Sequence, residues 1–411
     1  MADYLKQIWL GTRLKPGSDA LPLLLRAFGD ADGIFAADAM QIAEVMGNRR
    51  AEARLLTDKS LSDAERILEL CASHGVKLLT YFDDLYPASF RSLKDPPPWL
   101  FVRGELPNFG ETPTVSIVGT RDPNEYSRYQ TYKIAYDIAT AGAVTVSGLA
   151  LGIDAIAAAG TLAARGRTVG VLGSGIDIVY PRQHTFLARI ISETGCIITE
   201  LAPGSRPEKW HFPMRNRLIA ALADAVLVTA GPLCSGSLIT ARHAMAQEIP
   251  VYALPGRIDT PDGEGPARLL RDGARLCASA DDILLPLEER YPAIIDSTRL
   301  LDEPEVRYES AIRRYRVKTA SEVKKRHSWL LRDASEPYTD APQRRSESRT
   351  LRAELSAKEQ AVYDRIPVGG DCHPDELSSD GTSIAEVCAA LTMLEIYGLI
   401  ETTPGGRIRR K

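Results

Sequence analysis

Residues 114–121 read Thr-Val-Ser-Ile-Val-Gly-Thr-Arg, an apolar run that ends in a glycine and an arginine. The pattern of β-rich run, glycine or serine turn and polar helix start returns before Ala274, with the turns Ser147-Gly-Leu-Ala-Leu-Gly-Ile-Asp154, Leu172-Gly-Ser-Gly-Ile176 and Ser235-Gly-Ser-Leu-Ile-Thr240. A glycine between strand and helix lets backbone N–H groups approach an anion at the positive end of the helix dipole. Several such turns at one edge of a parallel sheet predict a groove for phosphates.

The strands of this region consist largely of Val, Ile, Leu and Ala, which suits a sheet that is buried on both faces. Because they alternate with helical segments, the sequence predicts the α/β class with a doubly wound, mostly parallel sheet. Strands are expected at 76–81, 99–102, 114–118, 144–147, 168–172, 196–199, 225–229 and 251–254, and helices at 127–141, 153–164, 183–194, 213–222 and 237–247.

The segments on either side differ in character and predict further domains. Residues 1–75 indicate a small helical domain of the SAM or helix-hairpin-helix type, with helices at 20–28, 36–46 and 62–74 and a capping box from Ser62 to Glu65. Residues 76–287 form the sheet domain, and the charged residues 288–354 are predicted to be a solvated linker.

The last part of the chain, residues 355–411, has the pattern of a winged-helix domain. Helices are expected at 358–366, 374–377 and 384–397, followed by strands 399–402 and 407–409 around the turn Pro404-Gly405-Gly406.

The composition of the 411 residues, 44% hydrophobic and 25% charged, is typical of a soluble protein of two or three domains. No apolar run approaches the ~20 residues that span a bilayer, and the N-terminus lacks the apolar region of a signal peptide. The scattered cysteines argue against a zinc site or disulfide framework and favour the reduced cytoplasm. With a net charge of −4, any binding of nucleic acid must rest on a local basic patch.

The most unusual stretch is Lys-Trp-His-Phe-Pro-Met-Arg-Asn-Arg at 209–217. Its aromatic rings offer stacking surfaces for bases and its cations can neutralise phosphates, which is how single-stranded nucleic acid is held. The alternative places Phe212 in the core and the arginines in salt bridges. At the first glycine turn, Arg121 can donate to phosphate oxygens, or else Gly119 only turns the chain and Arg121 is solvated.

Two further turns leave the choice between binding and structure open. Ser235 and Ser237 can cap their helix while spare N–H groups face an anion, or serve as caps alone. Gly173-Ser-Gly175 resembles part of a dinucleotide fingerprint, but Ile178 stands where the third glycine is needed and no acidic residue follows in the ribose-binding position. Nicotinamide and flavin cofactors are therefore not expected.

A catalytic site is not evident either. The sequence contains no His-x-x-x-His, no Gly-x-Ser-x-Gly and no dense pair of carboxylates. We therefore expect a binding protein rather than an enzyme, with neither cofactor nor metal.

Taken in order, these motifs resemble the DprA/Smf family of DNA-processing proteins. The residues that carry the resemblance are Val118-Gly-Thr-Arg121, Ser147 to Asp154, Val171 to Asp177 with Tyr180-Pro181, Phe212 to Arg217, Ser235 to Thr240, Pro255-Gly256 and Asp272-Gly-Ala274. The resemblance covers roughly residues 76–285 closely. It implies an extended Rossmann-like core that binds single-stranded DNA without catalysis, protects incoming DNA in natural transformation, loads the RecA recombinase, often displaces single-strand-binding protein, and forms homodimers.

The resemblance and the glycine turns together indicate a set of DNA-binding residues. They are Gly119, Thr120, Arg121, Ser147, Gly148, Lys209, Phe212, Arg215, Asn216, Arg217, Ser235, Gly236 and Ser237. Four positions depart from the family pattern: Ala158 replaces a histidine, Ala230 a glutamate, Cys234 a basic residue and Ala267 an asparagine. These departures are expected to thin the polar lining of the pocket.

Two other functions compete with this interpretation. One is an enzyme that processes nucleotides or sugar phosphates, of the phosphoribohydrolase type, but its Pro-Gly-Gly-x-Gly-Thr pattern and following glutamate are missing. The other is a transcription factor that uses the winged helix and the basic end Arg407-Ile-Arg-Arg-Lys411. The third helix of that domain carries Glu386 and Glu395, which suit neither a DNA groove nor a phosphate.

Overall fold

The computed structural model describes residues 2–300, 308–323, 357–367, 370–377, 386–387, 390–391, 394, 399–402 and 407–410. The chain divides into two units, Met1–Thr319 and Ala320–Lys411.

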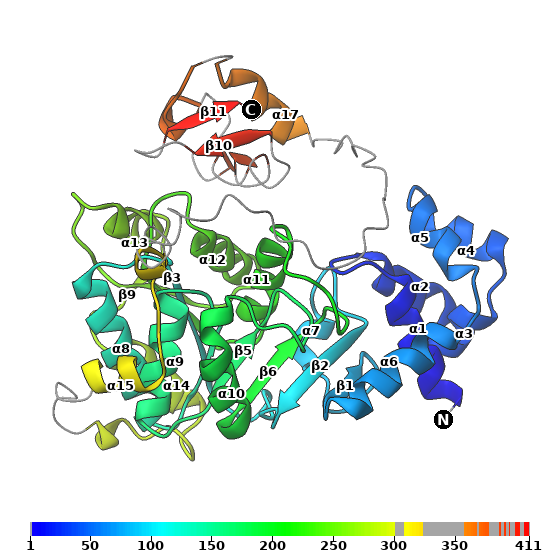
Figure 1. The fold of residues 1–411 in the computed structure, drawn as a ribbon, viewed down its shortest axis with the longest axis horizontal. Helices are drawn as coiled ribbons and strands as arrows, with labels where there is room; N and C mark the ends of the chain where they lie inside the picture. Colours follow the sequence, from blue (N-terminus) through cyan, green and yellow to red (C-terminus); the bar gives the residue numbers. More distant parts are fainter. Residues whose placement is uncertain are drawn as a thin grey trace, which may run out of the picture. The chain divides into compact units, whose positions relative to one another are not determined.

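The described part of the first unit is built around a nine-stranded sheet of order β1-β2-β6-β5-β4-β3-β7-β8-β9 (Figure 1). The strands are β1 Lys77–Thr80, β2 Trp99–Gly104, β3 Thr114–Gly119, β4 Val144–Ser147, β5 Thr168–Val171, β6 Cys196–Thr199, β7 Ala225–Ala230, β8 Val251–Ala253 and β9 Arg275–Leu276. The pairs β1–β2 and β2–β6 are antiparallel, and every other pair in this sheet is parallel. The predicted mostly parallel α/β fold is confirmed, with strand ends within one or two residues of the predicted ones.

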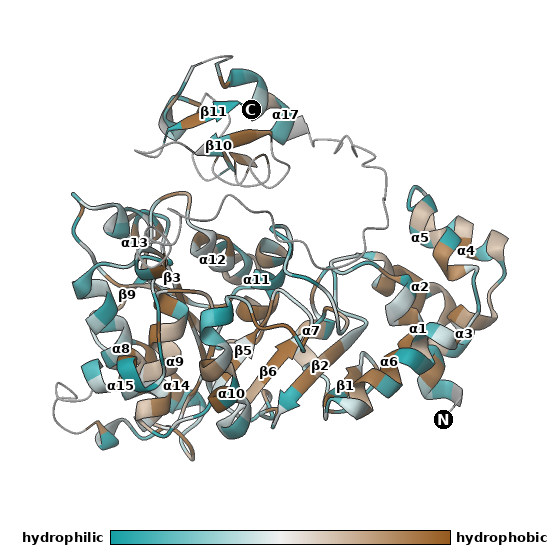
Figure 2. Cartoon of the chain, viewed as in Figure 1, coloured by the Kyte–Doolittle hydropathy of each residue, from teal (hydrophilic) through white to brown (hydrophobic). Residues whose placement is uncertain are grey.

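Helices cover both faces of the sheet (Figure 1). They are α8 Glu125–Thr140, α9 Ile153–Ala163, α10 Thr185–Thr194, α11 His211–Ala221, α12 Gly236–Ala246, α13 Pro261–Arg271 and α14 Asp281–Arg290. Alternate strand residues point to opposite faces, so Val115 and Ile117 pack with α8 and α14, whereas Val118 packs with α11 and α12. The strands in the middle of the sheet are therefore largely hydrophobic (Figure 2).

Six helices form the N-terminal part of the described chain: α1 Ala2–Arg13, α2 Ala20–Phe28, α3 Ala31–Ala36, α4 Ala39–Met46, α5 Arg50–Leu56 and α6 Ser62–Ser73. The helix predicted at 36–46 begins three residues later than predicted, because Asp38 caps α4 in a capping box with Gln41, and Ala36 ends the separate helix α3. The capping box predicted at Ser62 is wrong, since Ser62 lies inside α6. These helices share one hydrophobic cluster with Trp99 and Phe101 of β2.

The segment 308–319 departs from the predicted solvated linker. It begins with α15, Tyr308–Arg314, and buries Ala311, Ile312, Tyr315, Val317 and Thr319 within the first unit. Apolar side chains spaced three or four residues apart among paired arginines form this buried face. We call residues 308–319 the strap. Residues 301–307 and 324–354 of the predicted linker lie outside the described residues.

The second unit follows the predicted winged-helix order. It contains α17 Ala357–Arg365, a 3₁₀ turn η5 Pro374–Leu377, helical residues at 386–387, 390–391 and 394, and the antiparallel strands β10 Ile400–Thr402 and β11 Ile408–Arg410. Val362, Leu391 and Ile408 belong to its own hydrophobic core. The predicted turn at 404–406 and Glu395 lie outside the described residues.

Candidate nucleic-acid interface

The loops at the carboxyl ends of β3, β4 and β5 meet the first turn of α11 around a shallow hollow of about 40 Å³. We call it the aromatic hollow. It is lined by Arg121, Gly148, Ala150, Leu151, Tyr180, Pro181, Phe212 and Arg215. The structure brings the turns at Arg121 and Gly148 together at this edge of the sheet, the turn at 235–240 does not line the hollow, and phosphate binding stays a prediction.

Two aromatic rings and one guanidinium give this hollow its surface. The rings of Tyr180 and Phe212 lie 5.5 Å apart between centroids, tilted by 43°. The guanidinium of the exposed Arg121 lies over Phe212, 5.7 Å from the ring centroid. Tyr180 is 44% exposed and Phe212 is half-buried, so the rings remain open on one side. A flat π-surface beside a fixed cation suits a base and its phosphate.

The turn that resembles a dinucleotide fingerprint supports this aromatic surface. A Cβ atom at Gly173 would lie 2.8 Å from Cδ1 of Phe212, so only glycine leaves room for the ring. Tyr180 follows the same turn, and its peptide bond to Pro181 is cis. Tyr180 belongs to one of the sequence motifs but not to the predicted set of DNA-binding residues. An aromatic residue next to a glycine turn was the available signal.

A buried carboxylate and a buried guanidinium hold the loop 148–152 between β4 and α9, which lines one side of the aromatic hollow. We call this loop the rim. Asp154 accepts hydrogen bonds from the backbone N–H groups of Gly148 (3.0 Å) and Ala150 (3.3 Å). Arg215 donates to the carbonyl oxygens of Gly148 (2.8 Å) and Val171. Burial raises the pKa of Asp154, and burial lowers the pKa of Arg215 to about 10. The two side chains therefore hold the backbone of the rim through hydrogen bonds.

This arrangement changes the role predicted for three residues. The N–H of Gly148 already donates to Asp154, and the buried Ser147 hydroxyl donates to the Asp154 carbonyl oxygen (3.3 Å). The Arg215 side chain is only 5% exposed. The Ser147 hydroxyl and the Gly148 N–H are therefore used within the protein, Arg215 positions the rim, and direct contact of these residues with DNA stays a prediction.

Arg217 is also not available to a strand. It lies buried and forms ion pairs with Glu200 (2.7 Å) and Asp95 (2.7 Å). Burial alone would lower the pKa of Arg217, but these two carboxylates raise it instead. The salt-bridge alternative therefore holds for Arg217, because the buried Glu200 carboxylate requires a cation, and this pairing argues against the predicted contact between Arg217 and DNA.

The second basic residue at this edge faces solvent. Lys209 is exposed, and it has no ion-pair partner among the residues that the structure describes. In α11, Asn216 donates to the carbonyl oxygen of Gly236 (3.0 Å) and so links α11 to the start of α12. There, the Ser235 hydroxyl caps the helix by accepting from the Ser237 N–H (3.3 Å), while Gly236 is exposed. Capping by Ser235 is therefore established, and anion binding at Gly236 stays a prediction.

The first glycine turn fixes the base of Arg121. The Thr120 N–H donates to the Ala230 carbonyl oxygen (2.8 Å), and the Thr120 carbonyl oxygen accepts from the Ile153 N–H (3.1 Å). At Gly152, φ is +76° and a Cβ atom would lie 2.5 Å from the Thr120 oxygen, so glycine is required there. Gly119 and Thr120 hence position Arg121 through the backbone.

The four departures from the family pattern bear on the hollow less than predicted. Ala158 and Ala230 are fully buried, so neither lies on its surface. Cys234 is exposed at the start of α12, and Ala267 is half-buried in α13. None of the four lines the aromatic hollow.

The strap anchors the rim from the outside. His184 donates through Nδ1 to the Leu149 carbonyl oxygen (3.0 Å) and accepts at Nε2 from the Lys318 N–H (3.4 Å). The Gly152 N–H donates to the Lys318 carbonyl oxygen (2.9 Å). Burial lowers the pKa of His184, which favours the neutral ring that this pattern needs. The sequence offered no signal that joins these distant residues.

Two properties of the described residues bear on other functions. They contain no group of three or more His, Cys, Asp or Glu side chains that could hold a metal ion. In that same part of the chain, no helix combines the length and the apolar character needed to cross a bilayer.

Comparison with known proteins agrees with the geometry. The family model of DNA recombination-mediator protein A matches residues 77–288, and the model of the DprA winged helix domain matches residues 346–406. Protein Smf of Synechocystis is 31% identical over 419 residues, with both chains fully covered. DNA processing protein DprA of Bacillus subtilis is 38% identical over 225 residues, which are 55% of this chain and 76% of that one.

A solved structure supports the same relationship. The X-ray structure of DNA processing protein A from Streptococcus pneumoniae superposes with a TM-score of 0.61 and 29% sequence identity, and covers 68% of this chain and 97% of that chain. Sequence models, a full-length relative and a Rossmann-like structural neighbour all agree with the resemblance drawn from the motifs. This chain belongs to the DprA/Smf family of DNA-processing proteins.

Proposed function

We propose that the protein binds single-stranded DNA across the aromatic hollow. The observation that carries the proposal is the open pair of rings, Tyr180 and Phe212, with the Arg121 guanidinium fixed over one of them. In a duplex the faces of the bases are stacked on each other, so only an unpaired strand can present a base to these rings.

The side chains divide into contacts and supports. Arg121 and Lys209 neutralise phosphates, because both are exposed cations next to the hollow or at the start of α11. Phe212 and Tyr180 stack with bases. The open N-terminus of α12 at Gly236 offers N–H groups to a further phosphate, with Ser235, Ser237 and Asn216 shaping it. Asp154, Arg215 and the strap hold the rim.

The finer role follows from the family. We infer that the protein acts as a DNA-binding mediator in the cytoplasm rather than as an enzyme, protects incoming single strands, displaces single-strand-binding protein and loads RecA. Membership in a recombination-mediator family supports this role.

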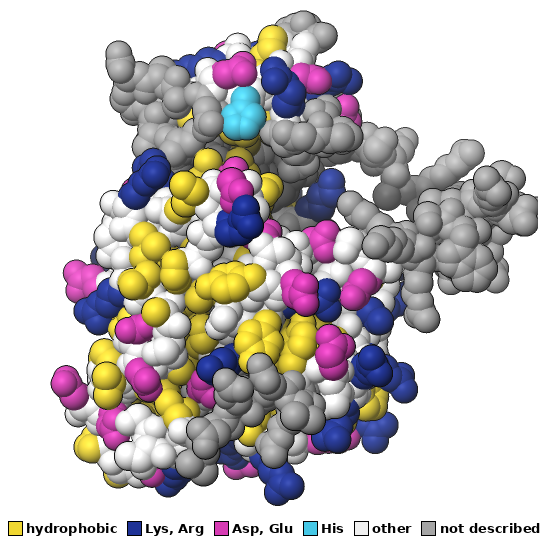
Figure 3. Space-filling view, turned by 90° about the vertical axis from the view of Figure 1, so that its left-hand side faces the viewer, with side chains coloured by type: hydrophobic (Ala, Val, Ile, Leu, Met, Phe, Trp, Pro, Cys, Tyr) yellow, Lys and Arg dark blue, Asp and Glu magenta, His cyan; other side chains and the backbone are white. Residues whose placement is uncertain are grey.

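We also infer a homodimer formed through the sheet domain. Leu276 in the edge strand β9 and Leu285 in α14 are 53% and 56% exposed. Figure 3 shows hydrophobic side chains gathered across the middle of the face that lies at the left of Figure 1, where β9 ends the sheet. Edge strands and exposed apolar side chains are surfaces that favour association.

A titration of the full chain tests DNA binding directly. Fluorescence anisotropy of a labelled oligothymidine should show saturable binding that weakens steeply with salt, because each neutralised phosphate releases counterions. The same sequence annealed to its complement should bind more weakly. Absence of saturable binding at low salt, or tighter binding of the duplex, would overturn the proposal.

A further inference from the structure

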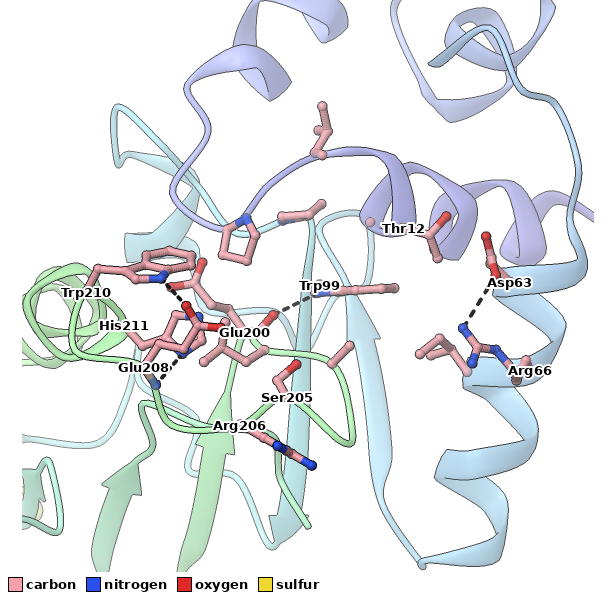
Figure 4. Close-up of a pocket in the computed structure, with 17 residues that line it drawn as sticks. Thr12, Asp63, Arg66, Trp99, Glu200, Ser205, Arg206, Glu208, Trp210 and His211 are labelled. Atoms are coloured by element: carbon pink, nitrogen blue, oxygen red, sulfur yellow. Dashed lines mark hydrogen bonds and ion pairs between the residues drawn. The ribbon is translucent and has the colours of Figure 1, made fainter. Parts of the chain in front are cut away.

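A second and larger cavity lies on the other side of the first turn of α11, between the N-terminal helices and the sheet domain (Figure 4). Its volume is about 450 Å³, within the range of small-ligand sites. The residues that line it come from α1, α6, β2, the loop after β6 and the start of α11: Gly11, Thr12, Leu14, Pro16, Asp63, Arg66, Ile67, Pro98, Trp99, Glu200, Leu201, Ala202, Ser205, Arg206, Glu208, Trp210 and His211. We call it the interdomain cavity.

Trp210 gives this cavity an aromatic wall. Its indole is 38% exposed, and its Nε1–H donates to the Glu208 carboxylate (2.5 Å). The ring also packs edge-on against His211, with centroids 4.1 Å apart. These two contacts fix the ring at the rim, where Figure 4 shows Trp210 and His211 on the side opposite Arg66. A large exposed ring held by neighbours on one side is a stacking surface.

Two arginines of the lining, Arg66 and Arg206, are open to an anion. Glu200 is paired with Arg217 (2.7 Å), and Asp63 is paired with Arg13 (2.9 Å). Arg66 approaches only this same Asp63, at 3.5 Å, and its side chain is 70% exposed. Arg206 is exposed, and within the described ranges it has no ion-pair partner. The third carboxylate of the lining, Glu208, is exposed and accepts from Trp210, so Arg66 and Arg206 are the groups of this lining that can bind an anion.

The position of this cavity relative to the aromatic hollow suggests what fills it. Trp210 lines the interdomain cavity and Phe212 lines the aromatic hollow, so the first turn of α11 carries one stacking ring toward each. Residues two apart on a helix point in different directions, and Lys209 directly precedes Trp210 and lies three positions before Phe212. A strand that crosses this turn would meet a ring and a cation on either side.

We propose that the interdomain cavity binds a nucleotide, with its base against Trp210 and its phosphate at Arg206, and with Arg66 of the N-terminal helices facing it. The inference rests on the proposed function, because the nucleotide belongs to the strand that also occupies the aromatic hollow. The N-terminal helices then take part in holding DNA, and the length of strand bound exceeds what the hollow alone accommodates.

Trp210→Ala tests the stacking contact, and Trp210→Phe is its matched control. With oligothymidines of about 4 and about 16 nucleotides, wild type should bind the longer one more tightly. Trp210→Ala should weaken binding of the longer one at least about five-fold, the equivalent of one lost stacked base, and abolish most of the gain with length. Trp210→Phe should retain most of it. Equal unfolding midpoints in urea show that the variants are folded.

The double variant Arg66→Ala, Arg206→Ala tests the phosphate contact. The slope of log affinity against log salt should become shallower by about 0.7 for each phosphate of a single strand that the variant no longer neutralises. Arg189→Ala, at an exposed arginine on α10, should leave the slope unchanged.

The outcomes separate this inference from the proposed function. If wild type fails to bind the longer oligonucleotide, the proposed function itself fails. If wild type binds it and Trp210→Ala and the double variant bind it equally well, the function stands and the strand does not enter the cavity. In that case dAMP serves as a probe: saturable binding lost in Trp210→Ala assigns the cavity to a free nucleotide, and unchanged or absent dAMP binding overturns the inference.

Discussion

The Arg121 guanidinium and the Phe212 ring, 91 positions apart in the chain, are brought to 5.7 Å by the end of β3 and the start of α11. The contact is a cation–π pair at the surface, where Arg121 is exposed and the Phe212 ring is half-buried. A base and its own phosphate can therefore be bound by two side chains that are already in place.

Replacing Phe212 should show how much stacking contributes. Phe212→Ala is expected to cost about 1–3 kcal/mol of binding free energy, the usual worth of one stacked base. Phe212→Tyr keeps the ring and should bind nearly as wild type does. Anisotropy titrations with oligothymidine measure both, and equal losses in the two variants would contradict a stacking role.

Replacing Tyr180 tests a ring that lies outside the set of residues predicted from the sequence. Tyr180→Ala should weaken binding of the same oligonucleotide in the same range, about 1–3 kcal/mol, if a second base lies on this ring. Tyr126→Ala is a suitable control, because Tyr126 is similarly exposed (46%) and does not line the hollow. Losses of the same size in both variants would argue against a specific role of Tyr180.

Replacing Arg217 should mainly lower the stability of the folded protein rather than its affinity for DNA. Arg217→Ala leaves Glu200 buried without its cation, and removal of one partner of a buried pair costs about 3–5 kcal/mol. Urea denaturation should therefore show a large drop in the unfolding midpoint. By contrast, Arg121→Ala should keep the midpoint and lose affinity. An unchanged midpoint for Arg217→Ala together with lost affinity would restore Arg217 as a contact residue.

Gly148 in the rim and Gly236 at the start of α12 give a pair of glycine substitutions with different expectations. A methyl group at Gly148 would collide with the Arg215 guanidinium, which is held by two carbonyl oxygens, so Gly148→Ala should lower both stability and DNA affinity. At Gly236 a Cβ atom meets nothing within 4 Å, so Gly236→Ala should leave stability intact. Thermal unfolding and anisotropy titration together check this, and equal effects at both positions would count against the packed rim.

Stability should fall in mild acid because of His184. Burial holds its pKa in the folded chain below the ordinary 6.5, so below pH 6.5 the unfolded chain binds a proton that the folded chain does not. The free energy of unfolding then decreases as the pH falls from 6.5 toward the lowered pKa, by up to about 1.4 kcal/mol per pH unit for one proton. In His184→Asn this slope should be smaller, whereas the exposed His74→Asn should keep the wild-type slope. Identical slopes in all three proteins would refute the role of His184.

Local patterns predicted the sheet and the position of the hollow, because strand hydrophobicity and glycine turns are properties of adjacent residues. Which cations face solvent could not be predicted in this way. Arg121 and Arg217 look alike in the sequence, and only the arrival of Asp95 and Glu200 from other elements buries the second. The strap was missed for a similar reason: its charge suggested solvation, while its buried face depends on α9.

The bonds from Lys318 to His184 and Gly152 have a consequence for the speed of recognition. They hold the rim in its folded form before any strand arrives, so the loop has little conformational freedom left to lose on association. A preorganised rim beside exposed cations favours capture at the rate of electrostatically guided encounter, without a slower step of loop closure. Single-exponential association whose rate rises in proportion to oligonucleotide concentration is the kinetic sign of such a rim.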